Sequence, residues 1–330
     1  MSAFYSYQDP SVRLTGRWDT KNGKAAITTA PGSYFEIAFE GDLIALHFDM
    51  TGNAESYPHL WISLDGGPMV ESVLTHYIRI KAKTAGKHTA AIHFKSAVEM
   101  QNRWLMPDLV GKVAFTGYDA EGAAELAPDN RKVIEFVGDS ITEGVLIDEF
   151  YSPITPDRDQ PNRPYQDDAL ATYSALTADA LDLRRINMGY GAVGACKSGC
   201  GDVPLAWQAY PYNFEGSPIE YPSPDYIVIN HGANDGGFSH EEYIRCYEKL
   251  LDVIIKMNPN AAIVALCSFH LEHHDELEAF IPEYNKAHGT DVHFISSKGW
   301  VARNPGHPYR DGHQQIADHL IPELKKLWNL

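Results

Sequence analysis

The chain has 330 residues, of which 44% are hydrophobic and 11% aromatic, so it can bury a large core and has the length of two domains. Its formal net charge of −17 argues against binding to nucleic acid or anionic membranes, because both require clustered Lys and Arg. No stretch approaches the roughly 18 to 20 uninterrupted apolar residues of a membrane span, and residues 1–10 lack the pattern of an export signal, so we expect a cytoplasmic protein with a small neutral or cationic substrate.

The first third of the chain, up to about Asp119, consists of short segments in which apolar residues alternate with polar ones, a pattern that predicts half-buried strands. Turn-forming residues separate these segments, among them Gly41–Asp42 and Ala85–Lys87. The sequence therefore predicts an antiparallel, jelly-roll-like β-sandwich over residues 1–125. Its predicted strands include Phe35–Phe39, Ile44–Phe48, Leu60–Leu64, Ile78–Ile80 and Ile92–Phe94.

A polar stretch of small residues, 117–130, precedes a change in pattern, so we expect a second domain over residues 126–330. Short β-branched segments now alternate with helical periodicity, of which Glu241–Met257 and His313–Trp328 are the clearest examples. This alternation predicts a three-layer α/β domain with a parallel sheet. Its predicted strands are Val133–Val137, Arg185–Met188, Tyr226–Asn230, Ala262–Leu266 and Val292–Ile295.

The first strand of this domain, Val133–Val137, ends on Gly138, Asp139 and Ser140. The carboxyl edge of a parallel sheet is where ligands and catalytic groups collect, so Ser140 could be a nucleophile. Any strand-to-helix turn can also carry Asp and Ser simply as helix caps. These three residues alone do not decide between the two interpretations.

Three further segments would bring chemically useful groups to the same edge. A glycine-rich loop, Asn187–Gly194, can present backbone N–H groups, and the segment Ile229–Asp235 carries the amide of Asn234. Before the last predicted helix, the segment Asn304–His313 carries His307. A serine nucleophile needs a base within hydrogen-bond reach, and the oxyanion that forms needs fixed donors. Together the four segments supply both.

These four segments, in this order, resemble the signature blocks of the SGNH (GDSL-type) hydrolases. The resemblance rests on Gly138–Ile141, the glycine loop, Gly232 with Asn234 and Asp235, and His307–Pro308, and it covers about residues 131–330. A β-sandwich in front of such a domain is similar to the layout of carbohydrate esterase family two, whose members remove acetyl groups from plant polysaccharides. The resemblance implies a serine acetyl esterase without a cofactor or metal ion, with a carbohydrate-binding-like accessory domain.

The resemblance also implies roles for individual residues. Ser140 would be the nucleophile and His307 the general base, while the N–H groups of Ser140 and Gly191 and the side chain of Asn234 would form the oxyanion hole. Asp139, Tyr190 and Trp207 are expected to contribute to substrate binding. His313, on the last helix, is expected to be structural. The substrate would be an acetylated xylo-, manno- or gluco-oligosaccharide, and an oligomer is compatible with the sequence.

The sequence departs from the family pattern at two points. Members often have an Asp three residues before the catalytic His, whereas this chain has Asn304, so what orients His307 stays open; Asp311 lies on the other side of it. Counting from Asn187 puts Ala192 where the family often has its glycine. Gly191, Ala192 or Gly194 could each supply the backbone donor, and Gly191 is the preferred choice.

Other functions are also compatible with parts of the sequence. Gly189, Gly191 and Gly194 satisfy a dinucleotide-binding pattern, but residues 197–204 do not read as the helix that a pyrophosphate site requires. The remaining alternatives are a GDSL-type acylhydrolase for non-carbohydrate esters, or a carbohydrate-binding protein with a vestigial catalytic domain. Retention of Ser140, Asn234 and His307 argues against the latter.

Two more groups of side chains invite a functional interpretation. Imidazoles and carboxylates gather after the fourth strand and could bind a metal, although a solvated loop is the favoured interpretation. That cluster is His270, Glu272, His273, His274 and Asp275. An aromatic insertion could form a wall for sugar rings or pack as an ordinary loop, and it contains Trp207, Tyr210, Tyr212 and Phe214. The four cysteines offer no paired zinc motif, so we expect reduced thiols.

Overall fold

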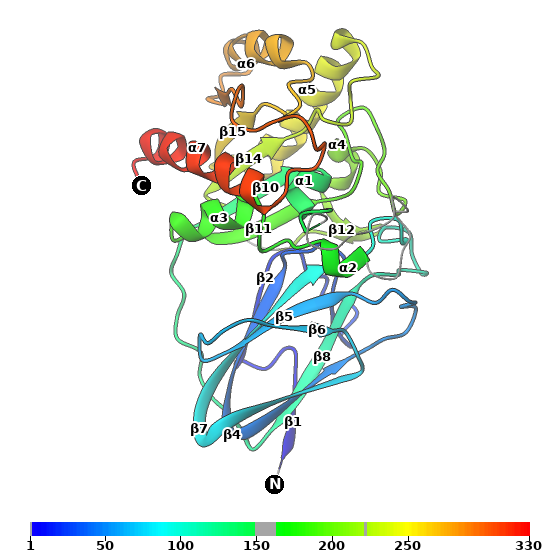
Figure 1. The fold of residues 1–330 in the computed structure, drawn as a ribbon, viewed down its shortest axis with the longest axis vertical. Helices are drawn as coiled ribbons and strands as arrows, with labels where there is room; N and C mark the ends of the chain where they lie inside the picture. Colours follow the sequence, from blue (N-terminus) through cyan, green and yellow to red (C-terminus); the bar gives the residue numbers. More distant parts are fainter. Residues whose placement is uncertain (1, 149–162, 221–222) are drawn as a thin grey trace.

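The computed structural model describes residues 2–148, 163–220 and 223–330. An all-β part and an α/β part lie end to end, with the N-terminus at the far end of the β part (Figure 1). The antiparallel β part extends to Ala123 and the parallel sheet begins at Val133. The predicted fold class is therefore confirmed.

The β part is built from nine strands in one antiparallel, hydrogen-bonded sheet, with the central order β1-β8-β4-β7-β5-β6. Apolar side chains from these strands enclose one core, which includes Phe35, Phe94 and Phe115. The strands are β1 (Ala3–Ser6), β2 (Val12–Thr15), β3 (Ala26–Thr28), β4 (Tyr34–Phe48), β5 (His59–Leu64), β6 (Val70–Val73), β7 (Tyr77–Ser96), β8 (Val113–Ala120) and β9 (Gly122–Ala123).

Two turns predicted in this part are not strand ends. Gly41 pairs with Gly86, and the next pair along the ladder is Leu43 with Lys81, so the register shifts while both strands continue. Gly41 has a φ of 115°, which glycine adopts at little cost, and this allows the chain to bend without leaving the sheet. As a result, the predicted strands Phe35–Phe39 and Ile44–Phe48 form the single long strand β4, and Ile78–Ile80 and Ile92–Phe94 form the single long strand β7.

The α/β part has a five-stranded parallel sheet in the order β11-β10-β14-β15-β16. Counted along this domain the order is 2-1-3-4-5, the flavodoxin-like arrangement, which opens a crevice beside the carboxyl end of β10. The strands are β10 (Val133–Gly138), β11 (Arg184–Gly189), β14 (Tyr226–Asn230), β15 (Ala262–Leu266) and β16 (His293–Ile295), with a separate pair β12 (Tyr212–Phe214) and β13 (Ser217–Pro218).

Helices cover both faces of this sheet. Ile134 and Phe136 of β10 belong to the core under α3 and α7, whereas Val137 belongs to the core under α5 and α6. The alternation follows from the period of two in a strand, and it explains why the strand is apolar on both faces. The helices are α1 (Ser140–Glu143), α2 (Arg163–Gln166), α3 (Tyr173–Ala180), α4 (Ala206–Ala209), α5 (His240–Met257), α6 (His274–His288) and α7 (Arg310–Trp328).

Two fully buried arginines of the β part, Arg17 and Arg103, form ion pairs with glutamates of the α/β part; the pair of Arg103 involves the short helix that begins at Ser140. Arg17 pairs with Glu135 in the middle of β10, with Nη2 2.8 Å from Oε1 and no exposure of either side chain. Arg17 also donates to the carbonyls of Tyr210 and Tyr212, and the hydroxyl of Tyr210 donates to the other oxygen of Glu135. The two parts are therefore joined by a hydrogen-bonded ion pair, and the core under α5 and α6 continues into the β part through Ala30 and Trp104.

Replacing Arg17 with alanine should destabilise the protein strongly, because Glu135 would stay buried without a countercharge. Loss of one partner of a buried pair costs about 3–5 kcal/mol. The matched control is Arg245→Ala, whose exposed guanidinium lies 4.0 Å from Glu241; it should change the free energy of unfolding by about 0.5 kcal/mol or less. Urea denaturation of both variants measures the difference, and equal effects would contradict this account of the interface.

Candidate active site

Ser140 lies on the tight turn between β10 and α1, at the carboxyl edge of the sheet. Asp139 caps α1, with its Oδ1 accepting from the Ile141 N–H at 2.9 Å. A Cβ at Gly138 would lie 2.1 Å from Thr142 Oγ1, so this tight turn requires glycine. The helix-cap interpretation thus holds for Asp139, and the cap leaves Ser140 at the first helical position, where its backbone N–H has no partner within the helix.

His307 meets Ser140 from the loop before α7. The distance between His307 Nε2 and Ser140 Oγ is 2.9 Å, a hydrogen bond between residues 167 positions apart. Asn304 is exposed, and Asp311 Oδ1 accepts from the N–H of Gly312 on its own helix. The structure therefore brings together the serine and histidine expected from the sequence.

Arg310, three residues after His307, fixes the start of α7. Its guanidinium donates to Asp148 Oδ2 at 2.7 Å and to Asp168 Oδ2 at 2.9 Å. The other oxygen of Asp168 accepts from the indole N–H of Trp61, a residue of β5 in the β part, at 3.1 Å. The loop that carries His307 is thus tied to both parts of the chain.

Asn234 reaches the Ser140 turn from the segment after β14. Its side-chain amide donates to Asp139 Oδ2 at 3.4 Å and to the Val193 carbonyl at 3.2 Å. Ser140 follows β10 and Asn234 follows β14, so they flank the crevice expected at the switch point of such a sheet. The predicted serine, histidine and asparagine converge from three distant segments.

The glycine loop gives a different donor from the one preferred on sequence grounds. Gly191 is buried, its backbone N–H faces the carboxylate of Glu143, and a Cβ there would lie 2.1 Å from Glu99 Oε2. Gly194 donates to the carbonyl of Lys197. Ala192 is partly exposed and adopts a left-handed φ of 58°, and no described residue accepts a hydrogen bond from its N–H. Because the Gly191 N–H already faces Glu143, the Ala192 N–H is the better candidate for the oxyanion-hole donor in this loop.

Two residues expected to bind substrate, Asp139 and Tyr190, lie inside the protein. Asp139 is 1% exposed, and burial raises its pKa to about 7, with the nearby carboxylates of Asp235 and Glu143 acting in the same direction. Tyr190 is fully buried, with its hydroxyl bonded to the Asn213 carbonyl. These two side chains therefore offer almost no surface to a substrate, and a part for either of them in substrate binding stays a prediction.

Side chains of the aromatic insertion contribute to the core, and a part for Trp207 in substrate binding stays a prediction. Trp207 packs on the core under α5, with the Lys249 ammonium 5.0 Å from its ring centroid. Tyr210 and Phe214 are buried, and Tyr210 is part of the Arg17–Glu135 network. Of the four aromatics, Tyr212 is the most exposed.

Sequence reasoning missed a second buried ion pair, on the helix that begins at Ser140. Glu143, on the same short helix as Ser140, pairs bidentately with Arg103 of the β part, and both side chains are buried. The Arg103 guanidinium also lies 5.3 Å from the ring centroid of Tyr190. The signal was present as a Glu three residues after the serine, but its partner lies 40 residues away and no spacing rule links them.

His313 has the structural role expected from the sequence. It is 1% exposed, stacks on Tyr173, and accepts the Tyr173 backbone N–H on Nδ1 at 3.0 Å. Burial lowers its pKa to about 3, with nearby His307 and Arg310 acting in the same direction. His313 is therefore a neutral histidine that supports the start of α3.

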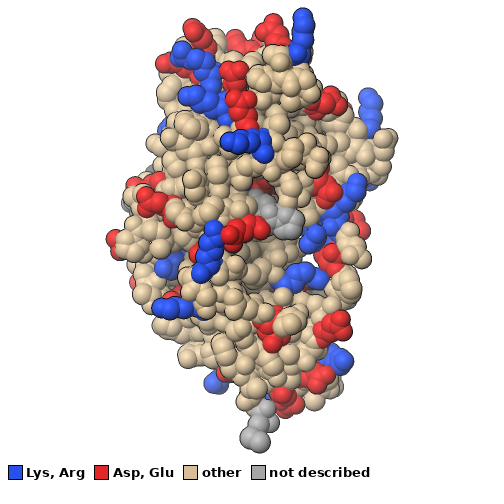
Figure 2. All heavy atoms as spheres, turned by 180° about the vertical axis from the view of Figure 1, so that it is seen from behind, with Lys and Arg blue, Asp and Glu red and all other residues tan. Residues whose placement is uncertain are grey.

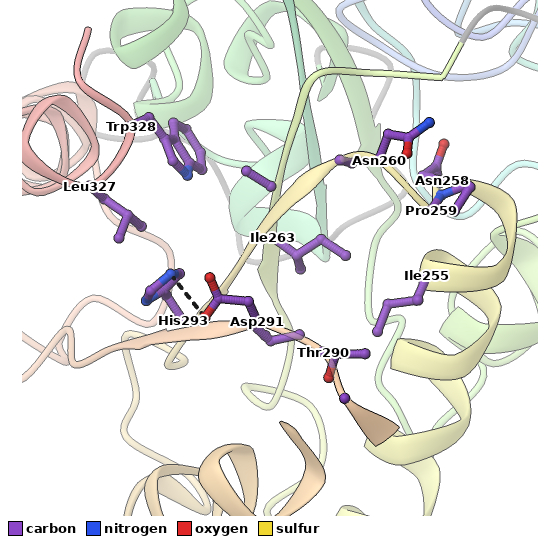
Figure 3. A pocket seen from close by; sticks show the side chains of 14 residues that line it. Ile255, Asn258, Pro259, Asn260, Ile263, Thr290, Asp291, His293, Leu327 and Trp328 are labelled. Carbon is purple, nitrogen blue, oxygen red and sulfur yellow. Dashed lines mark ion pairs between the residues drawn. The ribbon is translucent and has the colours of Figure 1, made fainter. Parts of the chain in front are cut away.

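A pocket of about 460 Å³ lies at the opposite edge of the sheet, where β15 and β16 begin (Figure 3). Its lining includes Ile263, Trp328 and the pair of Asp291 with His293, and none of the residues discussed above as catalytic candidates. Parallel α/β sheets bind ligands at their carboxyl edge. This pocket is consequently remote from the Ser140 chemistry.

Acidic and basic side chains are interspersed on the face shown in Figure 2, and among the described residues Lys and Arg form no continuous patch there. This distribution agrees with the net charge of −17. Across the described ranges, no helix combines the length and apolar character needed to cross a bilayer.

Comparison with known families agrees with this site. The GDSL-like lipase/acylhydrolase family matches residues 136–317, more than half of the chain, which includes Ser140, Asn234 and His307. The chain therefore belongs to this family of carboxylic ester hydrolases. The N-terminal domain model of carbohydrate esterase 2 matches residues 14–128. A search of curated proteins finds no significant match.

Solved structures show the same fold over the whole chain. A family two carbohydrate esterase from Cellvibrio japonicus has a TM-score of 0.81 at 20% identity, covering 100% of this chain and 98% of that one. An acetyl xylan esterase from the rumen bacterium Butyrivibrio proteoclasticus has a TM-score of 0.79 at 19% identity, with 100% and 99% coverage. A family two carbohydrate esterase from Clostridium thermocellum, solved with cellohexaose, has a TM-score of 0.75 at 21% identity, with 96% and 99% coverage. The family resemblance read from the sequence is confirmed.

The neutral state of His313 makes a prediction about pH. Its folded pKa lies below the unfolded value of 6.5, so the unfolded chain binds an extra proton as pH falls below 6.5. A glutamine can keep the acceptor for Tyr173 without titrating. The stability advantage of the wild type over His313→Gln should therefore shrink by about 1.4 kcal/mol per pH unit between pH 6 and 5.

Denaturation midpoints at several pH values measure this advantage. The control is His288→Gln, which makes the same replacement at a half-exposed position. A constant difference for His313→Gln would show that the buried histidine takes up a proton as readily as an exposed one.

Proposed function

We propose that the protein removes O-acetyl groups from carbohydrates through an acyl-enzyme on Ser140. The observation that carries the proposal is the 2.9 Å contact between His307 Nε2 and Ser140 Oγ at the carboxyl edge of the sheet, beside Asn234. Such a pair can activate a hydroxyl for attack on an ester carbonyl.

In the proposed mechanism, Ser140 Oγ attacks the acetyl carbonyl while His307 Nε2 takes the hydroxyl proton. The carbonyl oxygen becomes an oxyanion, which the N–H groups of Ser140 and Ala192 and the Asn234 amide would stabilise. His307 then donates the proton to the departing sugar oxygen, which leaves as a hydroxyl, and acetyl-Ser140 remains. Water, deprotonated by His307, attacks this ester, and His307 returns the proton to Ser140 Oγ as acetate leaves.

The substrate class is supported by the similar structures, which are described as carbohydrate esterases, an acetyl xylan esterase and a complex with cellohexaose. The match of the N-terminal segment to the carbohydrate esterase 2 domain points the same way. We therefore propose acetylated xylo-, manno- or gluco-oligosaccharides as substrates. A cytoplasmic location and an oligomeric state stay predictions from the sequence.

Chain length of the acyl group separates this proposal from a general acylhydrolase. Acetate release from the three acetylated oligosaccharides should exceed cleavage of p-nitrophenyl octanoate in kcat/KM. Preference for the octanoyl ester, with no acetate released from any of the sugars, would favour the non-carbohydrate alternative.

Alanine at Ser140 or at His307 should each lower kcat for p-nitrophenyl acetate by at least about 10³-fold, because nucleophile and base act as a unit. Ser223→Ala and His288→Ala, at exposed positions, are the matched controls and should keep wild-type rates. Unchanged rates in folded Ser140→Ala would rule out this serine as the nucleophile and would leave a vestigial domain or another site.

Asn234→Ala should lower kcat by about 10²–10³-fold with a smaller effect on KM, as expected for a donor that acts mainly in the transition state. Circular dichroism and melting temperature check that the loss of its bond to the Val193 carbonyl leaves the fold intact. Asn260→Ala, exposed before β15, is the control. An equal rise in KM with constant kcat would instead assign Asn234 to ground-state binding.

A further inference from the structure

Histidine and glutamate side chains meet between the amino ends of α5 and α6, outside the Ser140 site. The Nδ1 atoms of His240 and His273 are 2.9 Å apart, and Glu276 Oε2 lies 3.2 Å from His240 Nδ1. All three ligand atoms lie within 4.8 Å of one another. We infer that these residues form a binding site for one divalent transition-metal ion, with Zn²⁺ as the best match.

His273 is already arranged as a metal ligand. Its Nε2 lies 3.0 Å from the backbone carbonyl of Asp235, which can only accept, so Nε2 carries the proton and Nδ1 presents its lone pair. A ligand histidine typically donates its second N–H to a carbonyl or carboxylate in this way. The ring is 6% exposed and stacks on Tyr243 with centroids 4.2 Å apart, which holds its orientation.

The spacing of the three atoms suits a tetrahedral ion. Zn²⁺ bonds of about 2.0–2.1 Å to His and carboxylate ligands place neighbouring ligand atoms about 3.3 Å apart. The separations of 2.9 and 3.2 Å need small side-chain rotations to reach that value. A cavity of about 400 Å³ adjoins the cluster, so water can complete the coordination.

Local charge acts in both directions. The amino ends of α5 and α6 carry partial positive charge, and Lys298 lines the cavity, so both oppose a cation. Glu276 supplies a direct negative ligand, and Glu272 and Asp275 also line the cavity, so carboxylates outnumber the ammonium group. Imidazole with carboxylate is a donor set that suits Zn²⁺.

A neighbouring trio provides a comparison on the same helix. His274, Asp275 and Glu278 also bring ligand atoms together. However, none of these three residues is buried, whereas His273 is, so this trio has no ligand that packing holds in place as firmly. His274 is consequently a matched control rather than a second candidate.

An ion at His240, His273 and Glu276 would connect α5 to α6 and stiffen the segment that carries Asn234. His273 bonds to the carbonyl of Asp235, and the Asp235 carboxylate accepts from the N–H groups of Ala195 at 2.9 Å and Cys196 at 2.8 Å in the glycine loop. The expected effect is therefore on stability, and it does not depend on the proposed esterase activity.

The test is Zn²⁺ binding to the full chain after treatment with a chelator, followed by calorimetric titration and by melting temperature. The wild type should bind one equivalent and melt at a higher temperature with Zn²⁺. His240→Ala, at an exposed position, and Glu276→Gln should each weaken binding by about 10–100-fold or more, since loss of a ligand costs no less than loss of its outer partner. His274→Ala should bind like the wild type.

These variants keep all four cysteines, so capture of Zn²⁺ by thiols would persist in them. Equal affinity of the wild type and His240→Ala would overturn the proposal, and so would absence of binding to the wild type. A loss in His274→Ala as large as in His240→Ala would also overturn it, because the ion would then occupy the neighbouring trio.

Discussion

Two buried arginine–glutamate pairs lie on either side of Ser140, the proposed nucleophile, along the chain. Arg17 meets Glu135 on the strand that leads to Ser140, and Arg103 meets Glu143 at the end of the short helix that follows it. Each glutamate belongs to the α/β part and each arginine to the β part. A charge removed from water is tolerable only when it is paired and hydrogen-bonded. The local structure around Ser140 is therefore coupled to correct docking of the two parts.

The remaining groups of the site are positioned by neighbours in the same way. One carboxylate oxygen of Asp139 accepts the hydrogen bond that caps α1, and the other accepts from the side chain of Asn234. Arg310 fixes the loop of His307 through Asp148 and Asp168. Preorganised donors cost no reorganisation when charge develops on the substrate, which is how such sites lower a barrier. The polar groups buried around Ser140 act by holding the reactive ones in place.

Local patterns predicted the parts of this fold that local forces decide. The limits of β14 and β15 agree with prediction because β-branched runs end on turn residues, and α5 was found from its apolar periodicity. The sequence predicts turns at Gly41 and Gly86, where the structure has bends within continuous strands. Glycine indicates a bend but not whether the strand pairing continues across it. The direction of the Gly191 N–H and the partners of Glu135 and Glu143 depend on tertiary packing, which no local spacing records.

The same ion pairs bear on how such a chain can be rearranged. A gene fragment for residues 126–330 alone would encode a hydrolase domain in which the carboxylates of Glu135 and Glu143 face an empty interface near Ser140. Fusing that fragment to an unrelated binding domain would not restore the lost guanidinium groups. The two parts should therefore function only as a pair. A new N-terminal domain could replace the present one only if it carried Arg17 and Arg103, or equivalent residues at their positions.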